Sequence, residues 1–539
     1  MNLIKAMATV AGLTGLSRIA GFVRDILTAA ILGAGPLADA FFVALKLPNF
    51  FRRVTAEGAF SVAFVPIYAK RLESEGEEKA TLLASNAFMV MLSLLSVFTL
   101  LALLAMPYII MALAPGFDPA SVDPCLLQGA LCSRTEPWEM DMRYFMAVEF
   151  SRITFPYLLL MSLTALLGGV LNAHERFAPF AFAPVLFNVS LIVALLLSNY
   201  FESAGHALSW GLLAAGVFQL AFLWACTKRA GVNIKIARPR IDVDTKKIFA
   251  VMGPAVIGAG VVHINLFADL IIASFLGEGS ISYLYYADRL NQLPLGVVGI
   301  AVGTALLPML SKAMTKENGG EAKHLFNRAL EYCLLLALPA AVALAVMPLT
   351  LITVLFERGA FSAEDSMITA NVLVCYAIGL PAYIAIKVFS TAHWARHDTK
   401  TPVKISVVAT LLNIGLSLVF IQFMGVAGIA LATGLTGWVQ FIAHVRVLKD
   451  HSHAQLDQTF KRNILKIILS SCVMAAALYI LGALLHSWVF EGTLLYQLMA
   501  LTILVVGGMF VYAMSILLSG AVQVRDVKTY LIKGKGQRS

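Results

Sequence analysis

Residues 16–64 read LSRIAGFVRDILTAAILGAGPLADAFFVALKLPNFFRRVTAEGAFSVAF, and this stretch decides the fold. It is apolar enough to lie in a lipid bilayer, yet it contains eight charged residues. These are Arg18, Arg24, Asp25, Asp39, Lys46, Arg52, Arg53 and Glu57. A charge at the centre of a bilayer costs several kcal/mol, so charged residues of membrane helices normally face the bundle interior or a water-filled cavity. We therefore expect two adjacent helices here that line a polar, net-cationic cavity.

The composition of the whole chain agrees with a membrane protein. Of the 539 residues, 59% are hydrophobic and only 13% are charged, and the mean hydropathy is +0.83. These values are typical of a polytopic membrane protein and exclude a soluble enzyme of this length. The net charge of +9 would also suit a nucleic-acid-binding protein. The basic residues are spread over short loops, however, which argues against that class.

Fourteen stretches are long enough to span the bilayer, since a helix needs roughly 20 apolar residues for this. The runs are too long for strands and lack alternation. The sequence thus predicts an all-α fold with fourteen transmembrane helices. The predicted spans are 7–33, 37–66, 82–113, 145–172, 179–200, 206–227, 247–276, 281–311, 328–356, 365–393, 403–422, 426–446, 464–487 and 495–519.

The positions of the basic residues predict the orientation, because cytoplasmic loops are enriched in Lys and Arg. With the N-terminus inside, the cytoplasmic loops and the two termini contain 29 of the 40 basic residues. The opposite side contains three, namely Arg134, Arg143 and Arg358. We therefore expect both termini in the cytoplasm. Cys125 and Cys132 share one polar outer loop, where they either form a disulfide or remain two free thiols.

An internal repeat divides the chain. The segment at residues 32–35, LGAG, recurs as LGEG at 276–279, and Met106-Pro107 recurs as Met347-Pro348. Six spans separate the two copies, and because six is even, both copies enter the membrane from the same side. We predict an N-terminal lobe at 1–227, a parallel C-terminal lobe at 228–449, and an appended helical hairpin with a basic tail at 450–539. Two such bundles around a midplane site are typical of alternating-access transporters.

The second repeat contributes further charges at membrane depth. Asp288 and Arg289 lie in the eighth span and Lys387 lies in the tenth. Together with the first two helices they give a surplus of guanidinium groups, which suits a phosphate-bearing substrate because Arg contacts phosphate through two hydrogen bonds. The alternative is that the charges neutralise one another in structural pairs, as for Asp288 with Arg289 or Arg53 with Glu57.

Oxygen-bearing side chains in otherwise apolar spans indicate a candidate cation site. They are Asp269, Asn413, Ser417 and Thr433. Carboxylate, amide and hydroxyl oxygens suit a hard cation such as Na⁺. Hydrogen bonding between helices is the alternative role, since polar residues in membrane helices commonly have it. The histidines show no metal-binding spacing.

The motif DAFFVA-KLPN-RR-AEGAF within residues 39–60, with YYADRLNQLPLGVVGIAVGTALLP at 285–308, resembles the MurJ (MviN) family of bacterial lipid II flippases. The resemblance implies fourteen helices in the two lobes of the multidrug/oligosaccharidyl-lipid/polysaccharide exporter superfamily. It implies export of undecaprenyl-pyrophosphate-linked peptidoglycan precursor across the inner membrane, with Na⁺ bound near the candidate cation site in some members. The substrate-binding residues that it implies, with their charged neighbours and Asn49 of KLPN, are Arg18, Arg24, Arg52, Arg289, Asp39, Lys387, Lys46, Asn49, Asp25, Arg53, Glu57 and Asp288.

Several other functions stay open at this stage. A polysaccharide-lipid exporter or a drug/cation antiporter would share the superfamily, although the arginine surplus disfavours cationic drugs. A membrane-embedded enzyme acting on the same lipid carrier would need a catalytic carboxylate or histidine cluster, which the sequence does not indicate. A cell-wall assembly scaffold would not need buried charges. The sequence has no Walker loop for ATP, so we expect no cofactor. The energy would come from an ion gradient, the membrane potential or downstream consumption of the exported lipid.

Overall fold

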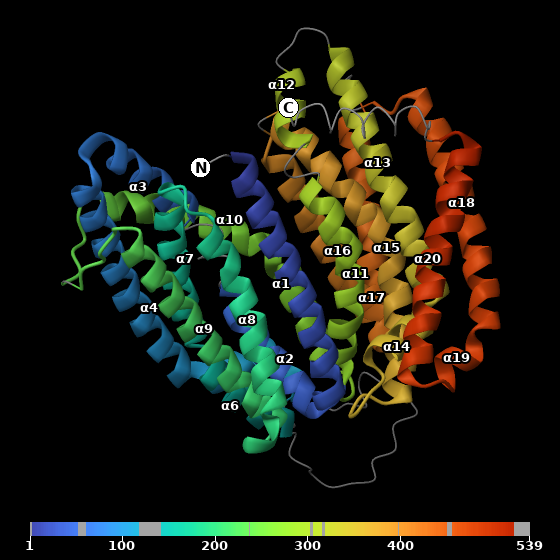
Figure 1. Cartoon of the computed structure of the whole chain (residues 1–539), viewed down its shortest axis with the longest axis horizontal. Helices are drawn as coiled ribbons and strands as arrows, with labels where there is room; N and C mark the ends of the chain where they lie inside the picture. Colours follow the sequence, from blue (N-terminus) through green and yellow to red (C-terminus); the bar gives the residue numbers. More distant parts are fainter. Residues whose placement is uncertain are drawn as a thin grey trace. The chain divides into compact units, whose positions relative to one another are not determined.

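The computed structural model describes residues 3–51, 61–117, 142–236, 238–301, 306–314, 319–396, 398–449 and 455–521. Every regular element in these ranges is a helix (Figure 1). The predicted all-α class is therefore confirmed. Arg52, Arg53 and Glu57 of the predicted cavity lie outside the described residues, as do Cys125 and Cys132.

The chain forms two compact units. Unit 1 comprises residues 1–282 with 358–361, and unit 2 comprises 283–357 with 362–539. The predicted divisions at residues 228 and 450 rest on the sequence repeat, whereas the units reflect packing. Helix α10 packs against α3 and α4 in unit 1, and α18 packs against α13 in unit 2. The three predicted domains stay a prediction.

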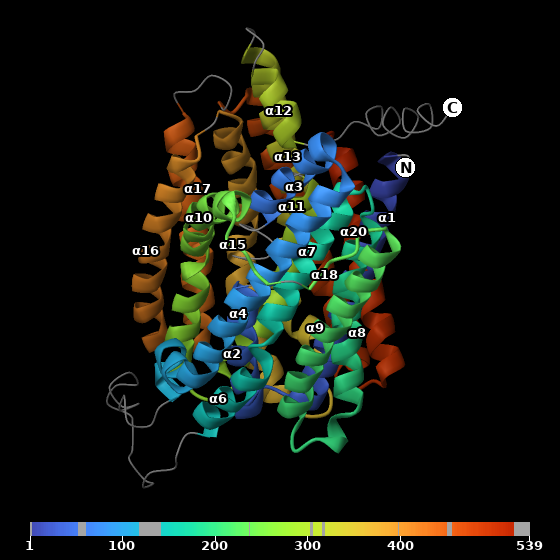
Figure 2. The same ribbon diagram turned by 90° about the vertical axis from the view of Figure 1, so that its left-hand side faces the viewer.

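Unit 1 is built from long helices whose apolar sides face one another. Helix α1 packs against α8, α8 packs against α9, and α9 packs against α7. Helices α4 and α7 run alongside each other (Figure 2). The helical elements of unit 1 are α1 (Leu3–Leu32), α2 (Pro36–Phe51), α3 (Ser61–Glu75), α4 (Glu77–Leu113), η2 (Pro115–Phe117), α6 (Met142–Thr154), α7 (Tyr157–Ala173), α8 (Ala178–Leu196), η4 (Ser198–Tyr200), α9 (Ala204–Arg229) and α10 (Val243–Ser274).

Unit 2 repeats this packing pattern. Helix α15 packs against α17 as α7 does against α9, and α16 packs against α17 as α8 does against α9. Helices α18 and α20 pack on each other, and α18 also contacts α13. Helix α11 (Ser280–Ala301) begins in unit 1 and continues into unit 2. The other helices are α12 (Leu307–Met314), α13 (Gly319–Val346), α14 (Pro348–Phe356), α15 (Ala363–Ala395), α16 (Lys400–Met424), α17 (Val426–Leu448), α18 (Gln458–Leu484), α19 (His486–Phe490) and α20 (Leu494–Ser519).

Ten helices of the described chain are long and apolar enough to cross a membrane. They coincide with the third to sixth and the ninth to fourteenth predicted spans, which identifies a multi-pass membrane protein. The other four predicted spans contain α1, α2 with α3, α10, and α11 with α12. Charged residues occur in each of these four, and the count of fourteen stays a prediction.

Local sequence explains where several helices begin or break. Helix α10 starts after Asp242, whose side chain accepts a hydrogen bond from the backbone N–H of Thr245, and α15 starts with a capping box of Ser362 and Asp365. The predicted ninth span breaks between α13 and α14 because Pro348 occupies the first turn of α14 and cannot continue the preceding helix.

A short segment from the second half of the sequence belongs to unit 1. Residues 358–361 follow α14, and the backbone N–H of Ala360 donates a hydrogen bond of 2.8 Å to the carbonyl of Ala30 in α1. Gly359 has a φ of +59°, and a Cβ there would lie 2.1 Å from the Ala30 oxygen. Only glycine fits this approach without a backbone shift.

Candidate functional site

Arg24 is held between α1 and α8. Its Nε and Nη2 donate to Asp25 Oδ1 at 3.1 and 2.6 Å, and its Nη1 donates to Asn188 Oδ1 at 3.0 Å. Asn188 in turn donates from Nδ2 to the carbonyls of Ser17 and Pro184, at 2.9 and 3.0 Å. The guanidinium is thus fixed in orientation, and its charge is partly balanced by a carboxylate that is only 4% exposed.

Arg18 differs from Arg24 in its surroundings. It is exposed on α1, and within the described part of the chain it makes no hydrogen bond or ion pair. A cation without an acidic partner in a membrane helix is available to bind an anion from outside the chain. Lys46 and Asn49, the other predicted site residues of this region that are described, are half-buried on α2.

Asp39 lies in α2 and is fully buried. Its carboxylate accepts hydrogen bonds from the backbone N–H groups of Gly279 and Ser282, at 2.8 and 2.9 Å, and from the Ser282 hydroxyl at 2.6 Å. These groups belong to the start of α11, where backbone N–H groups lack partners within the helix. Asp39 therefore caps α11, and contact with a substrate would require these hydrogen bonds to break.

Arg143 completes this buried polar group. The sequence placed it in an outer loop, but the structure has it in the first turn of α6, only 8% exposed. Its Nη1 lies 4.0 Å from Asp39 Oδ2, and its guanidinium lies 4.5 Å from the centre of the Phe117 ring. A buried carboxylate and a buried guanidinium thus stabilise each other, and the aromatic face adds a cation–π contact.

The predicted residues of unit 2 lie along α11 and α15. The guanidinium of Arg289 lies 4.3 Å from the centre of the Tyr285 ring. Asp288 accepts a hydrogen bond from the Gln292 side chain, and Lys387 donates from Nζ to the carbonyl of Leu295 at 3.4 Å. Lys387 of α15 therefore contacts α11, the helix that carries Arg289.

The candidate cation site is divided between the two units. In unit 2, Asn413 Nδ2 donates to Thr433 Oγ1 at 3.0 Å. Ser417 lies one turn further along α16, fully buried, and its hydroxyl makes no hydrogen bond to any described residue. Asp269 lies in unit 1, where it accepts a hydrogen bond of 3.4 Å from Asn265. The structure thus brings together three of the four predicted residues.

Sequence reasoning missed the role of Asn188. The internal repeat makes Asn188 the counterpart of Asn413, 225 positions later, but this correspondence indicates no contact with Arg24. The contact that gives it a role joins residues 164 positions apart. Neither helical periodicity nor a local motif indicates such a pair.

Comparison with known proteins decides the family. A family model described as lipid II flippase MurJ matches residues 28–500. The chain belongs to this family.

Two curated members of the MurJ family show how much of the chain the similarity covers. A probable lipid II flippase MurJ from Rhizobium meliloti (strain 1021) is 41% identical over 487 residues, which are 89% of this chain and 87% of the relative. A probable lipid II flippase MurJ from Rhizobium tropici is 37% identical over 541 residues, 98% of this chain and 97% of the relative. The family resemblance read from the motif at residues 39–60 is confirmed.

Solved structures agree with the MurJ assignment. A structure described as lipid II flippase MurJ in an inward closed conformation matches with a TM-score of 0.75 and 25% identity, over 94% of this chain and 97% of that chain. A multidrug MATE transporter of the MOP superfamily in an inward-facing conformation matches with a TM-score of 0.66 and 14% identity, over 83% of this chain and 99% of that one. The second match establishes a shared fold.

Proposed function

We propose that this chain translocates lipid II, the undecaprenyl-pyrophosphate-linked peptidoglycan precursor, from the cytoplasmic to the periplasmic leaflet of the bacterial inner membrane. The observation that carries the proposal is Arg18, an exposed cation on α1 without an acidic partner in the described chain. A pyrophosphate is the kind of group that satisfies such a guanidinium. The MurJ family membership supports the identity of the lipid.

Transport of labelled lipid II into the lumen of proteoliposomes tests this proposal. Arg18→Ala and Arg24→Ala should each lower the translocation rate by about tenfold or more, because a charge-assisted hydrogen bond contributes about 1.5–3 kcal/mol. Arg152→Ala is the matched control, since Arg152 is an exposed arginine of α6 in the same unit. If both cavity variants transported lipid II at the control rate, the arginine site would be wrong.

The proposed mechanism is alternating access with both termini in the cytoplasm. In this scheme the headgroup binds in the polar cavity while the polyprenyl chain stays in lipid. Helices α18 and α20 present apolar side chains outward, with Tyr479, Leu484 and Leu518 each more than 70% exposed. We propose that the polyprenyl chain lies against this hairpin, because an exposed apolar surface favours contact with a hydrocarbon chain over water.

We propose Na⁺ as the coupling ion. Asn413, Thr433 and Ser417 of unit 2 would supply oxygen ligands, and a carboxylate from Asp269 stays a prediction from the sequence. The Ser417 hydroxyl is buried and makes no hydrogen bond to a described residue, so its oxygen is available as a ligand. A sodium gradient would supply the free energy for export. Transport should be compared with and without this gradient, in the parent chain and in Asp269→Asn; four equal rates would exclude sodium coupling.

The same liposome assay separates the rival functions. A drug/cation antiporter would move a cationic dye and leave lipid II in place. A polysaccharide-lipid exporter would translocate a longer glycan on the same carrier at least as fast as lipid II. An enzyme acting on the carrier would change the mass of the lipid, and a scaffold would move nothing. We expect intact lipid II to be translocated.

A further inference from the structure

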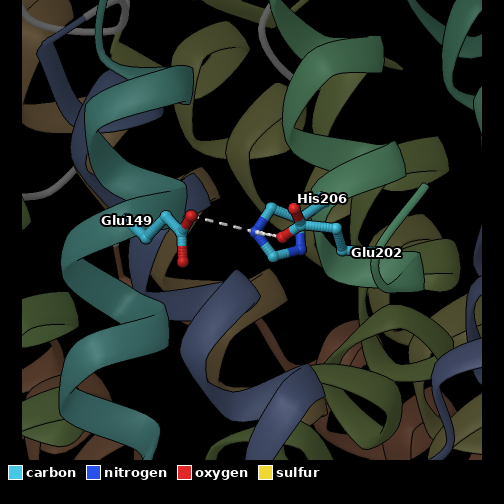
Figure 3. Close-up of side chains that lie close together, drawn as sticks. All are labelled: Glu149, Glu202 and His206. Atoms are coloured by element: carbon cyan, nitrogen blue, oxygen red, sulfur yellow. Dashed lines mark ion pairs between the residues drawn. The ribbon is translucent and has the colours of Figure 1, made fainter.

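Three side chains of unit 1 converge on one point away from the arginines described above (Figure 3). Glu149 comes from α6, Glu202 precedes α9, and His206 lies in the first turn of α9. The Nε2 atom of His206 lies 3.2 Å from Glu149 Oε1 and 3.7 Å from Glu202 Oε2. All three atoms that could bind a metal lie within 4.8 Å of one another.

Contacts with Ser203 and Phe150 fix the orientation of the His206 imidazole. Its Nδ1 lies 2.8 Å from the hydroxyl oxygen of Ser203, and its ring meets the Phe150 ring edge-on at a centroid distance of 5.0 Å. The Ser203 oxygen also accepts a hydrogen bond from the backbone N–H of His206, as the N-cap of α9. A second polar contact on the far nitrogen is how proteins orient a metal-binding histidine.

The other ring nitrogen of His206, Nε2, is buried and makes no hydrogen bond to any described residue. Nε2 has almost no exposed surface and has no hydrogen-bond partner among the described residues, although a Glu149 oxygen lies 3.2 Å away. The Nε2 atom thus lies within 3.7 Å of an oxygen of each carboxylate, and two neighbouring carboxylates repel each other unless a positive charge lies between them.

We propose that Glu149, Glu202 and His206 bind a Zn²⁺ ion. Imidazole nitrogen and carboxylate oxygen are both zinc donors, and three protein ligands leave a fourth position for water. The side chain of Glu202 is 86% exposed, so water can reach that position. The nitrogen donor favours zinc over Mg²⁺ and Ca²⁺, which prefer oxygen ligands.

A bound zinc ion would connect α6 to the beginning of α9. Both helices already pack against each other, so the metal would restrain one end of an existing contact. This site is independent of the proposed lipid II transport. The competing interpretation is an ion pair, in which His206 is protonated and the two glutamates balance its charge.

Zinc titration of the purified full-length chain in detergent tests the proposal. The starting variant should have Cys125, Cys132 and Cys472 replaced by serine, because free thiols also bind zinc, and any affinity tag should be removed. After dialysis against a chelator, zinc binding is measured by calorimetry and by the metal content per chain. We expect one zinc ion per chain, and no competition from Mg²⁺.

His206→Gln and Glu149→Gln should each weaken zinc binding by about 100-fold or more, since even outer-shell changes cost about 10–100-fold in metal affinity. His486→Gln is the matched control, because His486 is an exposed histidine of α19. Zinc should raise the thermal midpoint of the starting variant and of this control, and should leave the midpoints of the two site variants unchanged.

Absence of saturable zinc binding, or equal affinity in His206→Gln and the starting variant, would overturn the proposal in favour of the ion pair. If the two site variants do not fold, Glu202→Gln decides, because this exposed side chain is not needed for packing. Its zinc affinity should fall while its metal-free thermal midpoint stays at the starting value. An unchanged affinity in Glu202→Gln would likewise overturn the three-ligand site.

Discussion

The carboxylate of Asp39 accepts both the backbone N–H and the hydroxyl of Ser282, at 2.9 and 2.6 Å. With the Gly279 N–H as a third donor, one side chain of α2 caps a helix that starts 241 residues later. An anion at this place is favoured by the unpaired N–H groups and by the dipole of α11. The cap therefore fixes the start of α11, the helix that carries Arg289.

Asp39→Ala should destabilise the protein strongly. Two buried backbone N–H groups would lose their acceptor, and each costs about 1–3 kcal/mol. Thermal unfolding in detergent measures the effect. Asp242→Ala is a suitable comparison, because Asp242 is an exposed helix cap and its loss should cost only about 1 kcal/mol. Equal unfolding midpoints for the two variants would contradict the assigned cap.

Lysine should replace Arg18 better than it replaces Arg24. The guanidinium of Arg24 uses three nitrogens on Asp25 and Asn188, and an ammonium group cannot reproduce this arrangement. Arg18 has no such contacts within the described chain, so a lysine there would keep the positive charge and lose only the two-point contact with phosphate. Lipid II translocation at matched protein abundance measures both variants. A higher translocation rate in Arg24→Lys than in Arg18→Lys would refute this distinction.

A methyl group at Gly379 should loosen the crossing of α15 and α17. A Cβ on Gly379 would lie 2.5 Å from Gly434 Cα, so the helices must separate. Such overpacking costs about 1–3 kcal/mol. Gly415→Ala is the control, because no atom lies within 4 Å of a Cβ there, and it should be neutral or stabilise by up to about 1 kcal/mol. Thermal midpoints distinguish the two, and an unaffected Gly379→Ala would disprove the close contact.

Single cysteines in a cysteine-free background test the proposed orientation. A membrane-impermeant maleimide applied to intact cells with a permeable outer membrane should label Ser203→Cys and Glu491→Cys. It should label Lys235→Cys and Lys461→Cys only after the inner membrane is opened, because these positions flank the basic loops that define the cytoplasmic side. Labelling of Lys235→Cys from outside would reverse the topology.

The sequence alone was sufficient to predict features that depend on the local composition of the chain, such as the positions of the helices. Apolar runs of membrane length located the helices, because a bilayer forces such segments to satisfy their own backbone hydrogen bonds. The motif around Asp39 was sufficient to identify the family. The break between α6 and α7 was not predicted. It lies at Phe155-Pro156, where the proline cannot donate a backbone hydrogen bond.

The sequence could not specify what each charged residue contacts. Asp39 was expected in the cavity, but its hydrogen-bond donors belong to a helix that only the tertiary structure brings near. Glu149 and His206 gave no metal-binding signal because 57 positions separate them. Periodicity identifies the face of a helix on which a residue lies, whereas such pairs depend on which helices become neighbours.

The hydrogen bond from Ala360 to Ala30 limits where the chain can be cut into two separately expressed fragments. Residues 358–361 belong to unit 1, but they lie between two segments of unit 2. Any single cut after residue 282 and before residue 358 therefore leaves the N-terminal fragment without this segment, and the carbonyl of Ala30 loses the amide of Ala360. Two co-expressed fragments would have to reassociate before unit 1 is complete. A split version of this transporter thus depends on fragment complementation even for its first half.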